Sequence, residues 1–172
     1  MNNPPDSPAQ PVHAPHPPLT GYYASEQERR GFVGTLFDRT ASDYDRIDRL
    51  LALGSGPWYR NQALLRAGLK PGMRVVDIGV GTGLVAREAV KLVGDPALVV
   101  GVDPSAGMMA CADLPGVQLI EGRAEAIPFP DASFDFLSMG YALRHISDLS
   151  AAFSEFHRVL KPGGRLCLLE IT

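Results

Sequence analysis

The residues best suited to bind a ligand lie in one short stretch, residues 75–83, which reads Val-Val-Asp-Ile-Gly-Val-Gly-Thr-Gly. Its apolar start predicts a buried strand, and Gly79, Gly81 and Gly83 predict a turn that opens a helix. Glycine has no Cβ, so this turn can adopt positive φ angles and let a ligand approach the backbone. Leu84 stands where a dinucleotide fold would place a further glycine, which disfavours a nicotinamide dinucleotide as the ligand.

An acidic side chain ends the next predicted strand, where Asp103 follows the apolar residues 99–102. Ligands of open parallel sheets bind outside the carboxyl ends of the strands, and a carboxylate there can accept two hydrogen bonds from the cis-diol of a ribose. The alternative is that Asp103 caps the helix that follows. Ser105 is the better cap candidate, because Pro104 keeps Asp103 extended.

After residue 70 the sequence alternates short apolar runs with helical patterns. That alternation is typical of βαβ units, so we predict an α/β fold with a Rossmann-like parallel sheet and helices on both faces. The predicted strands are 74–78, 98–102, 117–120, 134–139 and 165–171, and the predicted helices are 84–93, 106–113 and 149–160. All of these elements fall in one predicted domain, residues 70–172.

Two further regions precede this domain. Residues 1–22 are rich in proline and carry too few large apolar side chains to offset the entropy of ordering, so we expect a disordered tail. Residues 23–69 place apolar side chains at three-to-four-residue steps, which predicts a helical cap. Within this region, Ser55 or Gly56 followed by Pro57 predicts the start of a helix.

The composition excludes several classes of function. A formal net charge of −3, without any cluster of Lys and Arg, argues against a protein that binds nucleic acid. Cys111 and Cys167 share no CxxC or histidine spacing, so we predict neither a zinc site nor a disulfide framework. No apolar run has the character of a secretion signal or the length of a transmembrane segment, so we expect a cytoplasmic protein.

A set of five motifs follows in order along the chain. They are the glycine turn at 77–83, the acid at Asp103, and the segments 121–131, 133–136 and 158–166. In this order they resemble the motifs of class I S-adenosylmethionine-dependent methyltransferases. More narrowly, Tyr-Ala-Leu-Arg-His-Ile at 141–146 and Leu-Glu-Ile-Thr at 169–172 are similar to segments of the ubiquinone/menaquinone C-methyltransferase family. The resemblance covers about residues 30–172 and implies S-adenosyl-L-methionine as the cofactor.

The resemblance implies contacts to the ribose and methionine parts of this cofactor. Asp103 would bind the ribose, with the glycine turn and Pro104 beside it. Asp77 either binds the amino group of the methionine part or only accepts hydrogen bonds from loop amides. Tyr44 is either a lid over the methionine end or, equally, an aromatic side chain that faces the core.

The adenine site departs from the family pattern. In the family, the segment after the third strand holds the adenine, usually with an aspartate that accepts a hydrogen bond from its amino group. Arg123 stands at that position here, and its side chain has no acceptor. We therefore expect recognition of the adenine through the backbone of Ala124, the carboxylate of Glu125 or packing of Ile127.

Two neighbouring side chains are the predicted catalytic residues. The family motif is Arg-Asn, and this chain has Arg144-His145. A quinol carbon becomes a better nucleophile when the neighbouring hydroxyl loses its proton, and Arg144 would stabilise the phenolate because arginine stays charged. His145 is a candidate base, because an imidazole titrates near neutral pH. The alternative for His145 is a surface or hydrogen-bonded histidine without a catalytic role.

The predicted function is methyl transfer to a small molecule, with C-methylation of a quinol-like or other lipid-soluble acceptor as the leading reaction. Such an acceptor would bring the protein into peripheral contact with a membrane. Family members continue for two more strands, whereas this sequence ends at residue 172, so we expect a fragment or a partner that covers the fifth strand. Self-association through that strand is the corresponding prediction. The alternatives are a catalytically silent cofactor-binding fragment and an NAD-binding oxidoreductase module.

Overall fold

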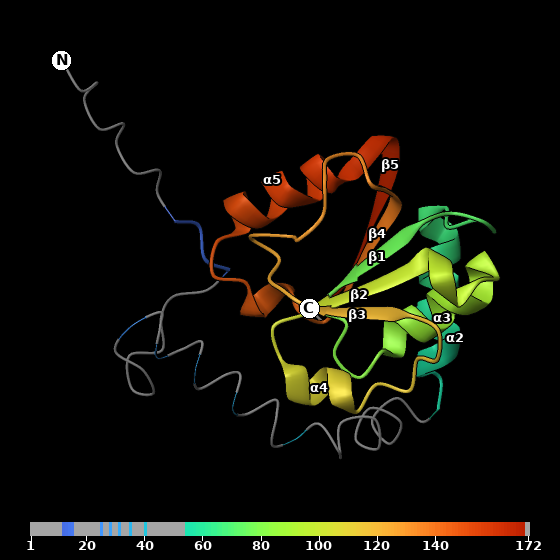
Figure 1. The fold of residues 1–172 in the computed structure, drawn as a ribbon, viewed down its shortest axis with the longest axis horizontal. Helices are drawn as coiled ribbons and strands as arrows, with labels where there is room; N and C mark the ends of the chain where they lie inside the picture. Colours follow the sequence, from blue (N-terminus) through green and yellow to red (C-terminus); the bar gives the residue numbers. More distant parts are fainter. Residues whose placement is uncertain are drawn as a thin grey trace.

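The computed structural model describes residues 54–170 and, before them, residues 12–15 and the single positions 25, 28, 31, 35 and 40. Its centre is a sheet of five parallel strands in the order β3-β2-β1-β4-β5 (Figure 1). The strands are β1 (Val75–Ile78), β2 (Val99–Asp103), β3 (Gln118–Glu121), β4 (Phe134–Gly140) and β5 (Leu160–Leu169). The predicted α/β class with five parallel strands is therefore confirmed.

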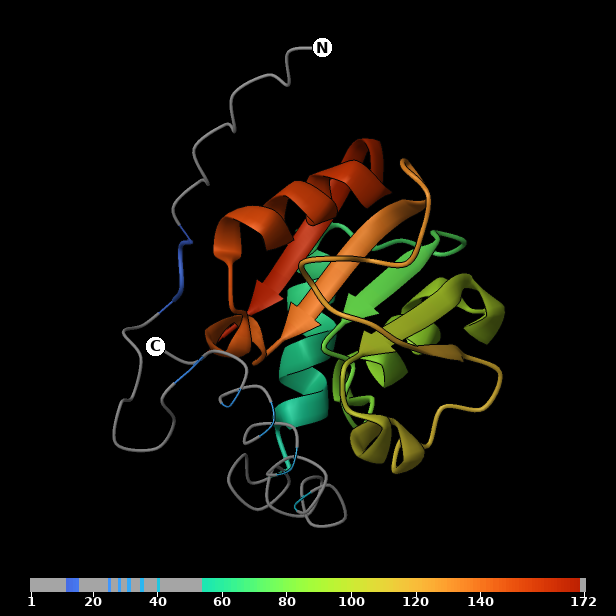
Figure 2. The ribbon, with the colours of Figure 1, turned by 60° about the vertical axis from the view of Figure 1, so that its left-hand side comes forward.

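Helices cover both faces of the sheet, as Figure 2 shows. α2 (Gly56–Ala67) and α3 (Leu84–Val93) pack on one face, and α5 (Leu149–Val159) packs on the other. The short α4 (Ala106–Ala110) follows β2, and the 3-10 helices η1 (Pro96–Leu98) and η2 (Leu143–His145) lie before β2 and after β4. Each of these connections returns the chain to the end of the sheet where the next strand begins, as parallel strands require.

Alternate residues of the strands form two halves of the core. Val75 and Phe136 point to the face that α2 and α3 cover. Their neighbours Val76 and Leu137 point to the face that α5 covers. Successive side chains of a strand point to opposite faces, so a strand covered on both sides reads as a continuous apolar run. That reading is the signal by which the strands were predicted.

The start and end of α2 agree with the turn signals in the sequence. The helix follows Ser55, has Pro57 in its first turn and ends before Gly68, whose φ is +92°. Proline fits the first turn because its missing N–H would be unpaired there, and glycine fits the left-handed position after the last turn. Most of the predicted tail and most of the predicted cap lie outside the described residues, as do residues 171–172.

The fifth strand begins earlier than predicted. β5 starts at Leu160, directly after α5, whereas the prediction began at Arg165 because Lys-Pro-Gly-Gly at 161–164 reads as a turn. The pairing with β4 shifts between Phe134↔Leu160 and Phe136↔Arg165, so the segment forms an irregularity within the strand. Edge strands tolerate proline and bulges, because their outer backbone groups need no partner strand.

β5 forms one edge of the sheet among the described residues. Its side chains at Cys167 and Leu169 are nevertheless buried in the core, and Leu166 is the one large apolar side chain of β5 that is exposed. The part of β5 without a neighbouring strand is therefore its backbone edge rather than an apolar face. In the described part of the chain, none of the helices combines the length and the apolarity needed to cross a bilayer.

One glycine of β4 permits close packing of α3 against the sheet. A Cβ at Gly140 would lie 2.5 Å from Cγ2 of Val85, which is far inside van der Waals contact. We expect Gly140→Ala to lower the free energy of unfolding by about 1–3 kcal/mol, measured by urea denaturation. The same substitution in a Val85→Ala background should cost much less, because the clashing methyl is gone. Equal costs in both backgrounds would contradict this packing.

Candidate functional site

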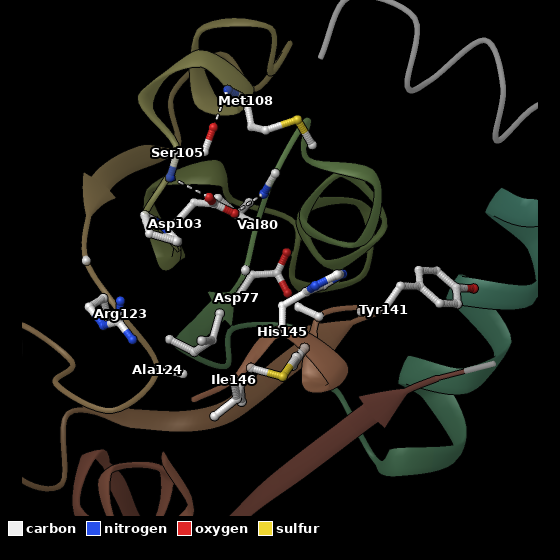
Figure 3. Close-up of a pocket in the computed structure, with 18 of the residues that line it drawn as sticks. Asp77, Val80, Asp103, Ser105, Met108, Arg123, Ala124, Tyr141, His145 and Ile146 are labelled. Carbon is white, nitrogen blue, oxygen red and sulfur yellow. Dashed lines mark hydrogen bonds between the residues drawn. The ribbon is translucent and has the colours of Figure 1, made fainter. Parts of the chain in front are cut away.

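A cavity of about 460 Å³ opens at the carboxyl ends of β1, β2 and β4 (Figure 3). Most of the residues predicted to bind the ligand line it, namely Asp77, Gly79, Gly81, Asp103, Pro104, Arg123, Ala124, Glu125 and also His145. Gly83 and Arg144 are not part of the lining, and Tyr44 lies outside the described residues. These lining residues are far apart in the sequence. They meet because the parallel strands that precede them end at the same side of the sheet.

The glycine turn has the backbone conformation that its composition predicts. Gly79 and Gly81 have φ angles of +69° and +53°, which side chains other than glycine rarely adopt. A Cβ at Gly79 would also lie 2.7 Å from Cβ of Ala142, on the turn after β4. Gly83 precedes α3 with a φ of +86°, and a Cβ there would meet Leu114. Gly83 therefore serves helix packing, while the other two glycines form the cavity wall.

Asp103 joins the glycine turn to the end of β2. Its Oδ2 accepts a hydrogen bond of 2.8 Å from the backbone N–H of Gly81, and its Oδ1 accepts one of 2.8 Å from the N–H of Ser105. The cap of α4 is Ser105, whose hydroxyl accepts from the N–H of Met108 at 3.0 Å. The alternative that Asp103 caps this helix is therefore wrong, and its carboxylate lines the cavity instead.

Asp77 is the most deeply buried acid of the cavity, with 1% of its surface exposed. Burial raises the pKa of its carboxyl to about 7; hydrogen bonds from Ser138 and Ala86 oppose the shift, and the negative charge of Asp103 adds to it. The Ser138 hydroxyl donates to Oδ1 at 2.6 Å. A cationic group bound beside Asp77 would favour the charged carboxylate, so this part of the cavity suits an ammonium group.

Ser138 was missed at the sequence level, where its polarity within an apolar stretch was the one local signal. It lies in register with Asp77 on the neighbouring strand and is the polar residue of an otherwise apolar part of β4. On the far side of Ser138, Cys167 is in register on β5, and the pKa of its thiol is raised by burial and by the charge of Asp77. The three residues form one polar row across the sheet below the cavity.

The segment after β3 closes the cavity on a second side. The Arg123 guanidinium donates to Oε1 of Glu125 at 3.1 Å and to the hydroxyl of Ser147 at 3.3 Å. The same carboxylate oxygen accepts the backbone N–H of Ser147 at 2.8 Å. Arg123 and Glu125 thus connect the segment after β3 with the approach to α5, and the backbone of Ala124 lies between them on the cavity wall.

The turn after β4 separates the two predicted catalytic residues. In Figure 3, His145 lies at the cavity beside Asp77, whereas the ring of Tyr141 points away toward α2. Arg144 points elsewhere: its Nη1 donates to Oε1 of Glu170 at 2.6 Å, and the side chain is about half exposed. The structure therefore brings His145, and not the guanidinium of Arg144, to the cavity.

The backbone conformation of Tyr141 is a feature of the site that the sequence does not reveal. Its φ is +59°, an uncommon value for an aromatic residue, and its N–H donates to the carbonyl of Leu169 at 2.7 Å. The guanidinium of the buried Arg60 in α2 lies over its ring, 5.8 Å from the centroid. No local pattern marks such a backbone conformation. Among the described residues, no group of His, Cys, Asp and Glu could hold a metal ion.

Comparison with known families places this cavity in context. A family model described as "Methyltransferase domain" matches residues 76–168, which contain the glycine turn, Asp103 and the segment after β3. A second model, described as protein-L-isoaspartate(D-aspartate) O-methyltransferase, matches residues 32–115. The first match spans more than half of the chain and includes all five strands except the first residue of β1 and the last of β5.

Curated relatives are similar over most of this chain. The ubiquinone/menaquinone biosynthesis C-methyltransferase UbiE of Hahella chejuensis is 33% identical over 153 residues, which cover 84% of this chain and 61% of that protein. The demethylmenaquinone methyltransferase of Symbiobacterium thermophilum is 34% identical over 157 residues, covering 85% and 61%. The chain thus spans about 61% of the length of these relatives.

Solved structures agree with the sequence comparison. A possible histamine N-methyltransferase from Thermotoga maritima, described as SAM-dependent, is 34% identical with a TM-score of 0.62, covering 78% of this chain and 59% of that one. Phosphoethanolamine N-methyltransferase 2 of Haemonchus contortus, solved with S-adenosyl-L-methionine, is 37% identical with a TM-score of 0.57, covering 64% and 27%.

The buried carboxyl of Asp77 makes the stability of the protein depend on pH. The raised pKa means that the native state favours the protonated acid, so its contribution to stability is complete below about pH 4 and is lost as the pH rises through about 7. Asp77→Asn should therefore be more stable than the parent at pH 8, on the order of 2–4 kcal/mol, with little difference at pH 4.

Urea denaturation at both pH values measures this difference. The exposed Asp113 offers a matched control, and Asp113→Asn should change stability little at either pH. A difference for Asp77→Asn that is the same at pH 4 and pH 8 would show that the carboxyl does not titrate as described.

Proposed function

Since this chain belongs to the family of class I S-adenosylmethionine-dependent methyltransferases, we propose that its cavity binds S-adenosylmethionine and that the protein methylates a small, quinol-like acceptor. The observation that carries the proposal is the pairing of Asp103, bonded to the glycine turn, with the buried Asp77 in one cavity. One acid can accept from a ribose, and the other suits an ammonium group. S-adenosylmethionine carries both groups.

The residues of the cavity fit the parts of this cofactor. Gly79 and Gly81 leave the wall without Cβ atoms, so a ligand can lie against the backbone there. Asp103 would accept hydrogen bonds from the ribose hydroxyls and Asp77 would pair with the amino group of the methionine part. Ala124 and Glu125 would hold the adenine, in the segment that follows β3.

The bound cofactor supplies an electrophilic methyl group on a sulfonium. The protein then has to orient the acceptor, exclude water and increase the nucleophilicity of the acceptor carbon. We assign the last task to His145, which would take the proton of the hydroxyl next to that carbon. The cavity places this imidazole on the side of Asp77, where the methionine end is proposed to bind.

Arg144 was predicted to stabilise the phenolate, which requires its guanidinium to reach the acceptor. Its bond to Glu170 and its exposure favour another role. Glu170 also accepts the backbone N–H of Leu143 at 3.2 Å, so the ion pair anchors η2 to the end of β5. We propose that Arg144 positions the turn that carries His145.

The acceptor class is inferred from the apolar part of the lining. Met139, Ala142 and Ile146 line the cavity together with His145. An aromatic ring with one ionisable hydroxyl suits such a surface, and two relatives carry quinone-pathway methyltransferase names. A cytoplasmic location, peripheral membrane contact and self-association through β5 are part of the same proposal. The alternatives, an NAD-binding module and a catalytically silent fragment, find no support in the family match.

Titration calorimetry with S-adenosylhomocysteine and NAD tests the cofactor proposal. The protein should bind S-adenosylhomocysteine and not NAD. Asp103→Ala removes the acceptor of the Gly81 N–H as well as the ribose contact, so affinity should fall by about 100-fold. Asp113→Ala, which removes an exposed acid, should leave it unchanged. Unaltered affinity after Asp103→Ala, or no affinity in the parent protein, would refute the proposal.

The pH profile of turnover tests the role of His145, with methyl transfer from labelled cofactor to a quinol as the measurement. His145→Asn should lower kcat by about 100-fold and remove the acidic limb of the profile. His157 is exposed on α5 and provides the control, because His157→Asn should retain both rate and profile. An acidic limb that persists in His145→Asn would exclude this histidine as the base.

A further inference from the structure

The segment after β3 leaves the cavity wall and runs alongside α5 to the start of β4. Its first residues, 122–125, line the cavity. The turn that follows is closed by a hydrogen bond of 3.2 Å from the N–H of Ala126 to the carbonyl of Arg123. Ile127 comes next, with its side chain buried in the core half that contains α5. The orientation of the Ile127 peptide groups therefore sets the direction of the backbone that forms the cavity wall at 122–125.

Two charged residues of α5 hold both backbone groups of Ile127. Oε2 of Glu155 accepts the N–H of Ile127 at 2.7 Å. Nη2 of Arg158 donates to the carbonyl of Ile127 at 2.9 Å. Apolar packing alone would fix the position of the Ile127 side chain but not the orientation of its peptide groups. The Glu155–Arg158 pair supplies that orientation.

The pair is itself rigid, and Arg158 extends the contact along the segment. Nε and Nη2 of Arg158 donate to the two carboxylate oxygens of Glu155 at 2.6 and 2.7 Å, a bidentate arrangement. Nη1 of Arg158 donates to the carbonyl of Phe129 at 2.7 Å and to Asp131 at 2.9 Å. The bond from Arg158 holds the pKa of Glu155 below its usual range, so the carboxylate stays charged at neutral pH.

We propose that Glu155 and Arg158 are positioning residues for the base of the cofactor, acting through the backbone of Ile127 on the wall formed by Ala124 and Glu125. The inference rests on the proposed cofactor. Neither residue lines the cavity, so neither would touch the cofactor. Their effect is confined to the segment after β3, while the ribose and amino-acid contacts depend on the separate glycine turn and Asp103.

This separation gives a test that a general loss of stability does not imitate. S-adenosylhomocysteine contains the base, and S-ribosylhomocysteine lacks it but keeps the ribose and the amino acid. Binding of both is measured with the full chain, by calorimetry for the first ligand and by ligand-observed NMR titration for the second. Arg158→Gln and Glu155→Gln should lower the affinity for S-adenosylhomocysteine about tenfold, because each removes a charged hydrogen bond to Ile127. The affinity for S-ribosylhomocysteine should stay unchanged.

Three further variants keep the test decisive. Arg158→Lys retains the charge but cannot bridge Glu155 and two carbonyls, so it should behave like Arg158→Gln. Asp131→Asn removes only the exposed partner of Arg158, and Arg66→Gln removes an exposed arginine of α2; both should bind the two ligands like the parent. The affinity for S-ribosylhomocysteine also reports whether each variant is folded.

Two results would overturn the inference. One is an equal loss of affinity for both ligands in all three variants of Glu155 and Arg158, which would indicate a general structural role. The other is unchanged affinity for S-adenosylhomocysteine in these variants. The proposed cofactor fails separately, because then the parent protein itself would not bind S-adenosylhomocysteine.

Discussion

The local structure of the site depends on the hydrogen bonds between one carboxylate and two backbone amides. Asp103 accepts from Gly81 and from Ser105, so the turn after β1 and the start of α4 meet at the same side chain. An ionised carboxylate can only accept, and its bonds to N–H groups are stronger than neutral ones. The turn is therefore held in its positive-φ conformation by the group that is also proposed to bind the ribose. At this position, structure and ligand binding cannot be separated.

The second acid of the cavity, Asp77, lowers the stability of the fold at pH values where a free carboxyl is ionised. Asp77 is buried, and the negative charge of Asp103 helps to raise its pKa to about 7. A buried carboxyl of this kind is more stable in the protonated form, and a cationic ligand would reverse that preference. The Glu155–Arg158 pair has a different effect, because its two charges neutralise each other and its hydrogen bonds hold a backbone segment in place. The two acids of the cavity thus favour binding of a cationic ligand, whereas the ion pair on α5 holds the backbone of the segment after β3.

The fold and much of the site could be predicted from local patterns. Continuous apolar runs gave the strands, and the glycine turn with Asp103 gave the position of the cavity. The boundary of β5 was wrong, because Lys-Pro-Gly-Gly reads as a turn although an edge strand accommodates it. The sequence also could not separate Arg144 from His145, since adjacent residues of a turn point in different directions that only the bond to Glu170 decides.

By itself, the sequence determined the order of the elements, the glycine turn, the acid at the end of β2 and the family. These features are local, because periodicity and residue type act within a few positions. The tertiary structure alone decided that Ser138 bonds to Asp77 and that Tyr141 adopts a positive φ. It also decided that Arg158 reaches Ile127, 31 positions away. Contacts of this kind arise when distant segments pack side by side, and no spacing within one segment encodes them.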